Sequence, residues 1–160
     1  MAGSHFERNR CRPTPEPAKR KDHELQTPKA WHANYSVGHP LLDQQHQHFL
    51  TLCENAPACL LADHSQAQED SAHVLLNELA EYARNHFREE EAILRDVGFP
   101  QLDAHVAEHH RYEERLADHL LAAIRGEIDP RALCHFVTSW WVEHITTSDA
   151  AYRDYLIQPR

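Results

Sequence analysis

Residues 86–112 read HFREEEAILRDVGFPQLDAHVAEHHRY, and this stretch decides the fold. On both sides of its centre the apolar residues recur at steps of three and four, which is the period of an α-helix. Between the two patterns, Gly98 and Pro100 predict a left-handed helix cap followed by a stop. The stretch therefore predicts two long helices joined by a short turn, an arrangement that favours antiparallel neighbours.

The same helical period extends over the chain from residue 40 onward, where Gly and Pro become scarce. Asp129 and Pro130 suit the N-cap and first turn of a last helix, and Pro57 predicts a bend or an end in the first helix. We expect four helices, over about 41–62, 67–97, 100–125 and 130–156. The predicted fold is all-α: an up-down-up-down four-helix bundle in one domain over residues 29–160.

The composition excludes several classes of protein. A formal net charge of -9 argues against nucleic acid or an anionic membrane surface as the main partner, since both bind through an excess of Lys and Arg. No run approaches the roughly 20 apolar residues of a membrane span, and the first residues lack the apolar core of a signal peptide. The four cysteines form no C-x-x-C pair, which fits reduced thiols. We therefore expect a cytoplasmic protein without a membrane span.

Residues 1–28 differ from the rest of the chain, because they combine prolines with Arg and Lys and have almost no aliphatic residues to bury. Such a composition predicts a disordered, basic N-terminal tail. This tail is either a plain flexible extension or a docking arm for an acidic protein partner.

Histidine is unusually frequent, at 15 of 160 residues, and it is dispersed along the chain. A lone inward histidine is more often a hydrogen-bonded core residue than a metal ligand. Here, however, each of the four predicted helices places polar groups on its apolar face, and burying them unpaired would be costly. Shared metal coordination is indicated for His46, His86, Glu90, His105, His109 and His144.

The donor set indicates two metal ions. Imidazole and carboxylate groups without thiolate suit iron or manganese and are compatible with zinc. Five histidines and two carboxylates, however, exceed what one tetrahedral zinc ion can use. Carboxylates bridge metal ions whereas neutral imidazoles rarely do, so Glu90 and Asp149 are expected to bridge the two ions.

Helix geometry separates the expected ligands from their neighbours. A four-residue step from His105 returns to the same face at His109, whereas His110 is turned by about 140° and is expected to face away. The five-residue step from His144 to Asp149 does not suit a regular α-helix, so we predict a π-bulge or widened turn in the TTS stretch between them. The remaining histidines are expected at the surface, including His32, His39, His48, His64, His73, His119 and His135.

The chain resembles the hemerythrins, above all the bacterial ones with a tryptophan near the domain start, here Trp31. The resemblance covers about residues 29–157 and rests on the segments VGHPLLDQQHQHFL (37–50), HFREEEAIL (86–94), FPQLDAHVAEHH (99–110) and WWVEHITTSDAAY (140–152). These contain, in order, the ligand motifs D-x-Q-H, H-x-x-x-E, H-x-x-x-H and H-x-x-x-x-D. Such an ordered set is highly specific.

This resemblance implies a centre of two iron ions, ferrous or ferric, bridged by an oxo or hydroxo group and by the two carboxylates. By the resemblance, His105, His109 and His144 hold one iron and leave it saturated. His46 and His86 hold the other, which keeps an open position for dioxygen.

Reversible oxygen binding also requires a dry pocket. The expected walls lie within four positions of a ligand: Phe49, Phe87, Trp140, Trp141 and Ile145. Simple core packing explains these residues equally well. Trp141 and Phe49 stand where members of the family often carry a smaller aliphatic residue, so we expect a narrow oxygen channel.

The expected function is reversible dioxygen binding for storage, transport or delivery, by a monomer that is not an enzyme. The alternatives are an oxygen or redox sensor, or a di-iron enzyme that reduces peroxide or nitric oxide. A sensor would pass its signal to an output domain, and an enzyme would add an inner-sphere acid or an electron-entry module. We identify neither in the sequence. A ferritin-like di-iron bundle would need E-x-x-H pairs, which this chain lacks.

Overall fold

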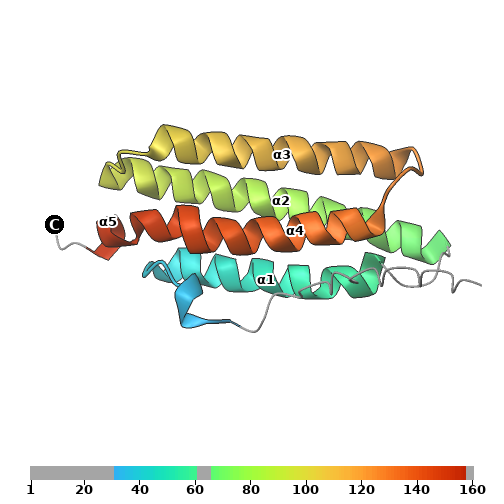
Figure 1. Ribbon diagram of the computed structural model, residues 1–160, viewed down its shortest axis with the longest axis horizontal. Helices are drawn as coiled ribbons and strands as arrows, with labels where there is room; N and C mark the ends of the chain where they lie inside the picture. The colour runs from blue at the N-terminus through green and yellow to red at the C-terminus, as the bar shows by residue number, and fades with distance from the viewer. Residues whose placement is uncertain (1–30, 61–65, 158–160) are drawn as a thin grey trace, which may run out of the picture.

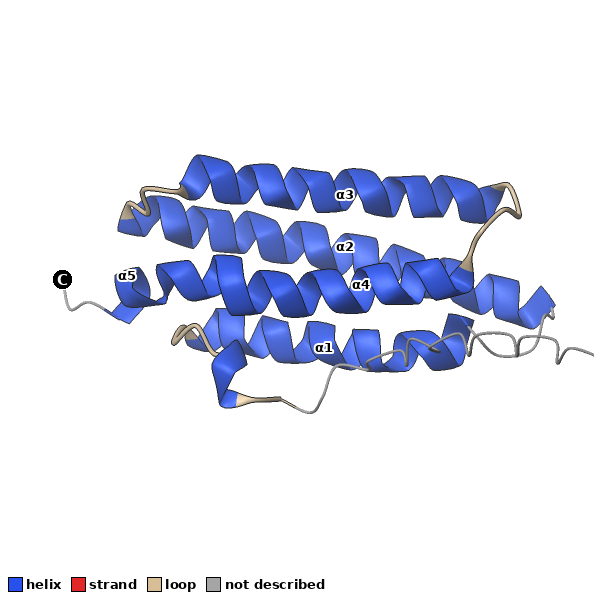
Figure 2. Ribbon diagram, in the orientation of Figure 1, coloured by secondary structure: helices blue, strands red, loops and turns tan. Residues whose placement is uncertain are grey.

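The computed structural model describes residues 31–60 and 66–157, with side chains described for 31–56 and 73–157. The predicted tail at 1–28 lies outside the described residues. Within them every regular element is helical, as Figure 2 shows. The elements are η1 (Ala33–Tyr35), α1 (Pro40–Leu60), α2 (Gln66–Val97), α3 (Leu102–Ile124), α4 (Pro130–His144), η2 (Ile145–Asp149), η3 (Ala150–Tyr152) and α5 (Arg153–Ile157).

The four long helices lie side by side as an antiparallel bundle, which confirms the predicted fold class (Figure 1). Helix α1 packs closely on α2 and α4, and α2 packs closely on α3. The backbones of α3 and α4 approach each other less closely, and large rings such as Tyr112, Phe136 and Trp140 fill the space between them. The seam between α3 and α4 is therefore the widest in the bundle.

Local chemistry sets where the helices end. Gly98 and Gly126 have φ values of 71° and 69°, a left-handed conformation that a residue with a Cβ adopts only under strain. Both follow the last turn of a long helix, as the sequence predicts. At the start of α4, the Asp129 carboxylate accepts hydrogen bonds from the backbone N–H groups of Arg131 and Ala132 at 3.0 and 3.1 Å. Helix α1 does not end at Pro57 but continues to Leu60.

The fourth helical region departs from one continuous helix. The α-helical part ends at His144, and residues 145–149 form a turn of π-helix. The predicted π-bulge between His144 and Asp149 is thus confirmed. A short 3-10 turn and the five-residue helix α5 follow, so the expected single helix over 130–156 is divided into four segments.

Two separate hydrophobic clusters form the core. The larger one includes Phe49, Phe87 and Trp141, and the smaller one comprises Val37, Leu42, Leu94, Phe99 and Tyr152. Along α1, His46 falls between Leu42 of the small cluster and Phe49 of the large one. A polar layer therefore crosses the bundle between the two apolar regions. None of the helices in the described ranges combines the length and hydropathy that a membrane crossing needs.

Candidate metal centre

The polar layer brings together all seven residues expected as metal ligands. Helix α1 supplies one of them, α2 and α3 supply two each, α4 supplies one, and the π-turn η2 supplies the last. Each is at most 4% exposed: His46, His86, Glu90, His105, His109, His144 and Asp149. Burying so many ionisable groups is unfavourable unless each finds a compensating partner.

Three histidines surround one end of this layer. His109 Nε2 lies 3.1 Å from His144 Nε2 and 3.1 Å from Glu90 Oε2. His105 Nε2 lies 3.3 Å from the same Glu90 oxygen. One donor atom from each of these four residues falls within 4.8 Å of all the others, which is the spacing of ligands around a single cation.

The other two histidines form a second group that also contains Glu90. His46, His86 and Glu90 each place one donor atom within 4.8 Å of the others. The carboxylate of Asp149 also spans both groups, since Oδ2 lies 3.3 Å from His46 Nε2 and Oδ1 lies 3.1 Å from His144 Nε2. Glu90 and Asp149 thus lie between the two sets of histidines.

The outer ring nitrogens of three histidines have carboxylate or amide partners. His86 Nδ1 lies 2.9 Å from Gln45 Oε1, and His109 Nδ1 lies 2.8 Å from Glu91 Oε1. His144 Nδ1 lies 3.1 Å from Glu108 Oε2, which also accepts a hydrogen bond from the Ser148 hydroxyl at 2.6 Å. An acceptor at Nδ1 favours the tautomer whose Nε2 carries a lone pair directed inward, as a metal ligand requires.

The sequence analysis missed these outer partners. Glu91 and Glu108 each adjoin a predicted ligand in the sequence, and Gln45 precedes His46, but each contacts a histidine of a different helix. Tyr152, whose hydroxyl donates to Glu90 Oε1, was also missed. Its position three residues after Asp149 is the one signal that could have indicated it.

The electrostatics keep the central carboxylates ionised. Burial raises the pKa of Glu90, but hydrogen bonds with His105 and His109 outweigh burial and hold this pKa well below its usual value. For Asp149, burial and the nearby Glu90 raise the pKa, yet His144 and His46 lower it to about 2. Burial lowers the pKa of His86 to about 4, so this imidazole stays neutral. Ionised carboxylates and a neutral imidazole are the forms that bind a cation.

The donor atoms fit a bound metal better than a metal-free core. His46 Nε2, His86 Nε2 and both carboxylate oxygens of Asp149 are buried, and their close contacts with other described residues lack the geometry of a hydrogen bond. Such orphaned groups are rare in native proteins because each loses its hydration without compensation. A pair of cations would satisfy all four atoms, and the mixture of imidazole and carboxylate suits iron.

Among the described residues, the other histidines belong to neither donor group. His110 is exposed, in agreement with its expected outward direction. Among the histidines without an assigned role, His32, His48 and His135 are exposed, whereas His39, His73 and His119 are half-buried. His64 lies outside the described residues.

Comparison with known proteins agrees with this arrangement. The family model described as the hemerythrin HHE cation binding domain matches residues 37–156. Bacteriohemerythrin of Stenotrophomonas maltophilia is 26% identical over 78% of this chain and 78% of its own length. That of Clostridium acetobutylicum is 26% identical over 78% of this chain and 98% of its own. A hemerythrin-like protein of Naegleria gruberi is 26% identical over 82% of this chain and 97% of its own length.

Solved structures show the same fold. A wild-type hemerythrin superposes with a TM-score of 0.67 at 24% identity, covering 74% of this chain and 88% of that one. An alanine variant of hemerythrin superposes with a TM-score of 0.73, also at 24% identity, covering 80% of this chain and 96% of that one. With the family model matching most of the chain, the protein belongs to the hemerythrin family of HHE cation-binding domains.

Proposed function

We propose that the buried cluster holds two iron ions and that the protein binds dioxygen reversibly there. Membership of the hemerythrin family supports a non-heme di-iron, oxygen-binding domain. The two donor groups that share Glu90 are the observation that carries the proposal. In it, His105, His109 and His144 would hold one iron, His46 and His86 would hold the other, and Glu90 and Asp149 would be shared by both ions.

The chain's own residues prepare the site for this role. When bound, a pair of ferrous ions supplies the two electrons that reversible dioxygen binding requires. Glu90 and Asp149 remain ionised, because their histidine neighbours keep both carboxyl pKa values low. The Tyr152 hydroxyl stays protonated, since burial and the adjacent carboxylates raise its pKa, and it donates to Glu90. The carboxylate orientation is thereby fixed without a mobile acid at the site.

Aromatic side chains exclude water from the two-histidine side. The rings of Phe49 and Trp141 stack with centroids 3.7 Å apart, and the Trp141 ring lies 5.4 Å from that of His86. Phe87 lies between the two sides, because its ring centroid is 5.8 Å from that of His86 and its ring also stacks on that of His109 at 3.8 Å. These rings and Ile145 are at most 3% exposed. They support a narrow, dry pocket in which a bound oxygen molecule is protected from outside protons.

Trp140 differs from the other four expected wall residues. It is half-buried and stacks on His144 with centroids 4.3 Å apart and an interplanar angle of 15°. It therefore lies on the three-histidine side and toward the surface. We assign the oxygen pocket to Phe49, Phe87, Trp141 and Ile145 and give Trp140 a different role below.

Oxygen storage or delivery is the physiological role we propose, with the protein acting as a carrier. The test is to load the protein with iron, reduce it anaerobically, admit air and then remove oxygen under vacuum while recording the visible spectrum. A coloured adduct that forms and disappears reversibly is expected. Immediate conversion to a stable diferric form with turnover of peroxide or nitric oxide would instead identify a sensor or an enzyme. One zinc ion per chain would overturn the di-iron assignment.

A further inference from the structure

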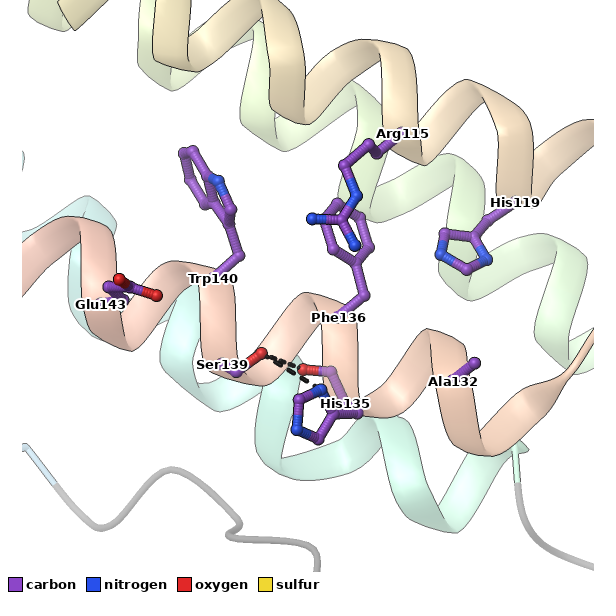
Figure 3. Close-up of a pocket in the computed structure, with 8 residues that line it drawn as sticks. All are labelled: Arg115, His119, Ala132, His135, Phe136, Ser139, Trp140 and Glu143. Atoms are coloured by element: carbon purple, nitrogen blue, oxygen red, sulfur yellow. Dashed lines mark hydrogen bonds between the residues drawn. The ribbon is translucent and has the colours of Figure 1, made fainter.

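A surface groove lies along the wide seam between α3 and α4 (Figure 3). Its volume is about 400 Å³, within the range of sites for small molecules. Figure 3 shows Arg115 and His119 reaching in from α3, and Phe136 and Trp140 from α4. Ala132, His135, Ser139 and Glu143 complete the lining. The groove thus combines aromatic rings with a cation, and it lies outside the metal cluster.

Trp140 connects this groove to the metal centre. One part of the side chain lines the groove, and the indole ring stacks almost parallel on the imidazole of His144. The edge of that imidazole ring carries Nε2, which lies 3.1 Å from Asp149 Oδ1. Electronic coupling between groups falls steeply with distance, and stacked rings in van der Waals contact couple well. A molecule in the groove is therefore separated from a ligand of the proposed iron by a single indole.

Arg115 gives the groove a preference for anions. Its guanidinium lies 4.4 Å from the centroid of the Phe136 ring, and among the described residues no carboxylate forms an ion pair with it. A guanidinium with unused donors is well suited to a phosphate or carboxylate group. On the far side of Trp140, a second cavity of about 270 Å³ is lined by Glu108, Arg111 and Glu143, and Glu143 also lines the groove. Within the groove, Glu143 lies beyond Trp140 and away from Arg115, so an anionic group is expected at the Arg115 end (Figure 3).

We propose that this groove binds a reduced flavin nucleotide and that Trp140 passes its electrons to the iron centre through His144. The phosphate contacts the Arg115 guanidinium, which covers the buried Phe136 ring, and the flat ring system lies against the half-buried Trp140. This inference rests on the proposed di-iron centre. It adds a route by which a diferric, oxygen-inactive protein is returned to the diferrous form.

The redox step is balanced by two single-electron transfers. In each, the reduced flavin loses one electron and releases a proton to solvent, and one ferric ion becomes ferrous. Two transfers restore the diferrous pair. The indole supplies the path and undergoes no net change.

Binding is tested first on metal-free protein, so that this result does not depend on iron. Flavin mononucleotide fluorescence is titrated with wild-type protein and with Arg115→Gln, and riboflavin serves as the probe without phosphate. We expect saturable quenching with the wild type and a dissociation constant about tenfold higher for Arg115→Gln with the nucleotide. The substitution should leave riboflavin binding unchanged. Two results would refute the groove as a flavin nucleotide site. One is the absence of saturable quenching with wild-type protein, and the other is an equal loss of affinity for flavin mononucleotide and riboflavin in Arg115→Gln.

Electron transfer is tested on the iron-loaded diferric protein by anaerobic stopped flow with photoreduced flavin mononucleotide. In Trp140→Leu, the rate of reduction extrapolated to saturating flavin mononucleotide should fall on the order of tenfold, and this extrapolation separates the electron path from any loss of flavin affinity that the missing indole causes. The matched control is Trp31→Leu, because Trp31 packs against Tyr35 and does not line the groove. An equal limiting rate in wild type and Trp140→Leu would refute the electron path.

Iron content separates this inference from the proposed function. Both tryptophan variants should bind as much iron as the wild type and give the same diferric spectrum. If wild-type protein bound no iron pair, the proposed function would fail, while the groove would still be judged by the fluorescence titration. If the iron pair formed and bound oxygen but reduction did not depend on Trp140, only the electron path would fail.

Discussion

At the scale of single residues, the partner of each outer histidine nitrogen decides how firmly the imidazole is held. Glu91 is the clearest case, since its carboxylate contacts His109 Nδ1 at 2.8 Å and no other helix provides that ring with a polar contact on this side in the described structure. Replacing such an outer partner typically weakens metal binding by about 10- to 100-fold. For Glu91→Ala we expect iron affinity to fall in that range, measured by competition with a chelator of known affinity.

The matched control is Glu78→Ala, which removes an exposed carboxylate from the same helix. It should leave iron affinity unchanged. If Glu91→Ala bound iron as tightly as this control, the carboxylate would have no role in orienting His109. Thermal melting of both metal-free variants would show whether either one is simply less stable.

Trp141 governs access to the two-histidine side. This side chain is fully buried and stacks on both Phe49 and Phe87. In Trp141→Leu, space opens next to His86, so oxygen should bind and dissociate several times faster in flash photolysis. The lost packing should also lower the free energy of unfolding, by about 2–4 kcal/mol.

Leu133→Ala is the control for stability in this case, because Leu133 is a fully buried member of the same cluster on α4. It should lower stability without accelerating oxygen binding. Equal oxygen kinetics in wild type and Trp141→Leu would show that Trp141 does not limit access.

The sequence predicts which side chains point into the bundle as expected ligands, but it does not predict which residues of other helices contact them. His105 and His109 interrupt an apolar stripe, and that contrast is visible in one helix alone. The contact between Glu108 and His144 depends on how α3 and α4 lie relative to each other, which no single helix encodes. Trp140 illustrates the same limit, since the sequence indicates its nearness to His144 but not that it opens onto a surface groove.

At the scale of elements, the π-turn η2 is what places Asp149 in the site. An α-helical step of five residues would rotate Asp149 about 140° away from His144, whereas the widened turn directs both side chains to the same layer. Helix boundaries and this bulge were predictable because caps, glycines and ligand spacing are local signals. The 3-10 turn after Asp149 was not, since it depends on how Tyr152 packs against Phe99 and Glu90.

Inserting one alanine after Thr147 would lengthen the step from His144 to Asp149 to six residues, which in an α-helical turn rotates Asp149 about 120° away from His144. Asp149 would then lose its contacts with His46 and His144, and we expect the iron content to fall from two ions per chain, measured by metal analysis. Far-ultraviolet circular dichroism should change little, because the four long helices remain. Thr147→Ala removes the hydroxyl that bonds to the Glu143 carbonyl but keeps the residue count, so it should retain iron. Full iron content in the insertion variant would contradict a positioning role for the π-turn.

At the scale of the whole molecule, the bundle consists of two apolar clusters separated by a layer of buried ionisable groups. The two clusters and the capped helices stabilise the fold. The layer of buried ionisable groups lowers the stability of the bundle unless cations neutralise it. A metal-free chain should therefore fold with native helix content but with lower stability. Because the metal binds the folded chain, the difference in stability between the metal-bound and metal-free protein depends on the concentration of free metal.

We accordingly expect chelation of iron to lower the melting temperature, and reloading to restore it. With free ferrous iron at 100 times its dissociation constant, binding at one site should add about 2.7 kcal/mol, which corresponds to roughly 5–11 °C for a domain of this size. Anaerobic calorimetry at several iron concentrations measures the shift, and His144→Asn provides a variant with one ligand weakened. That variant should show a smaller shift with iron. Because the apolar clusters are the same in all samples, a melting temperature independent of iron would mean that the buried layer is satisfied without metal.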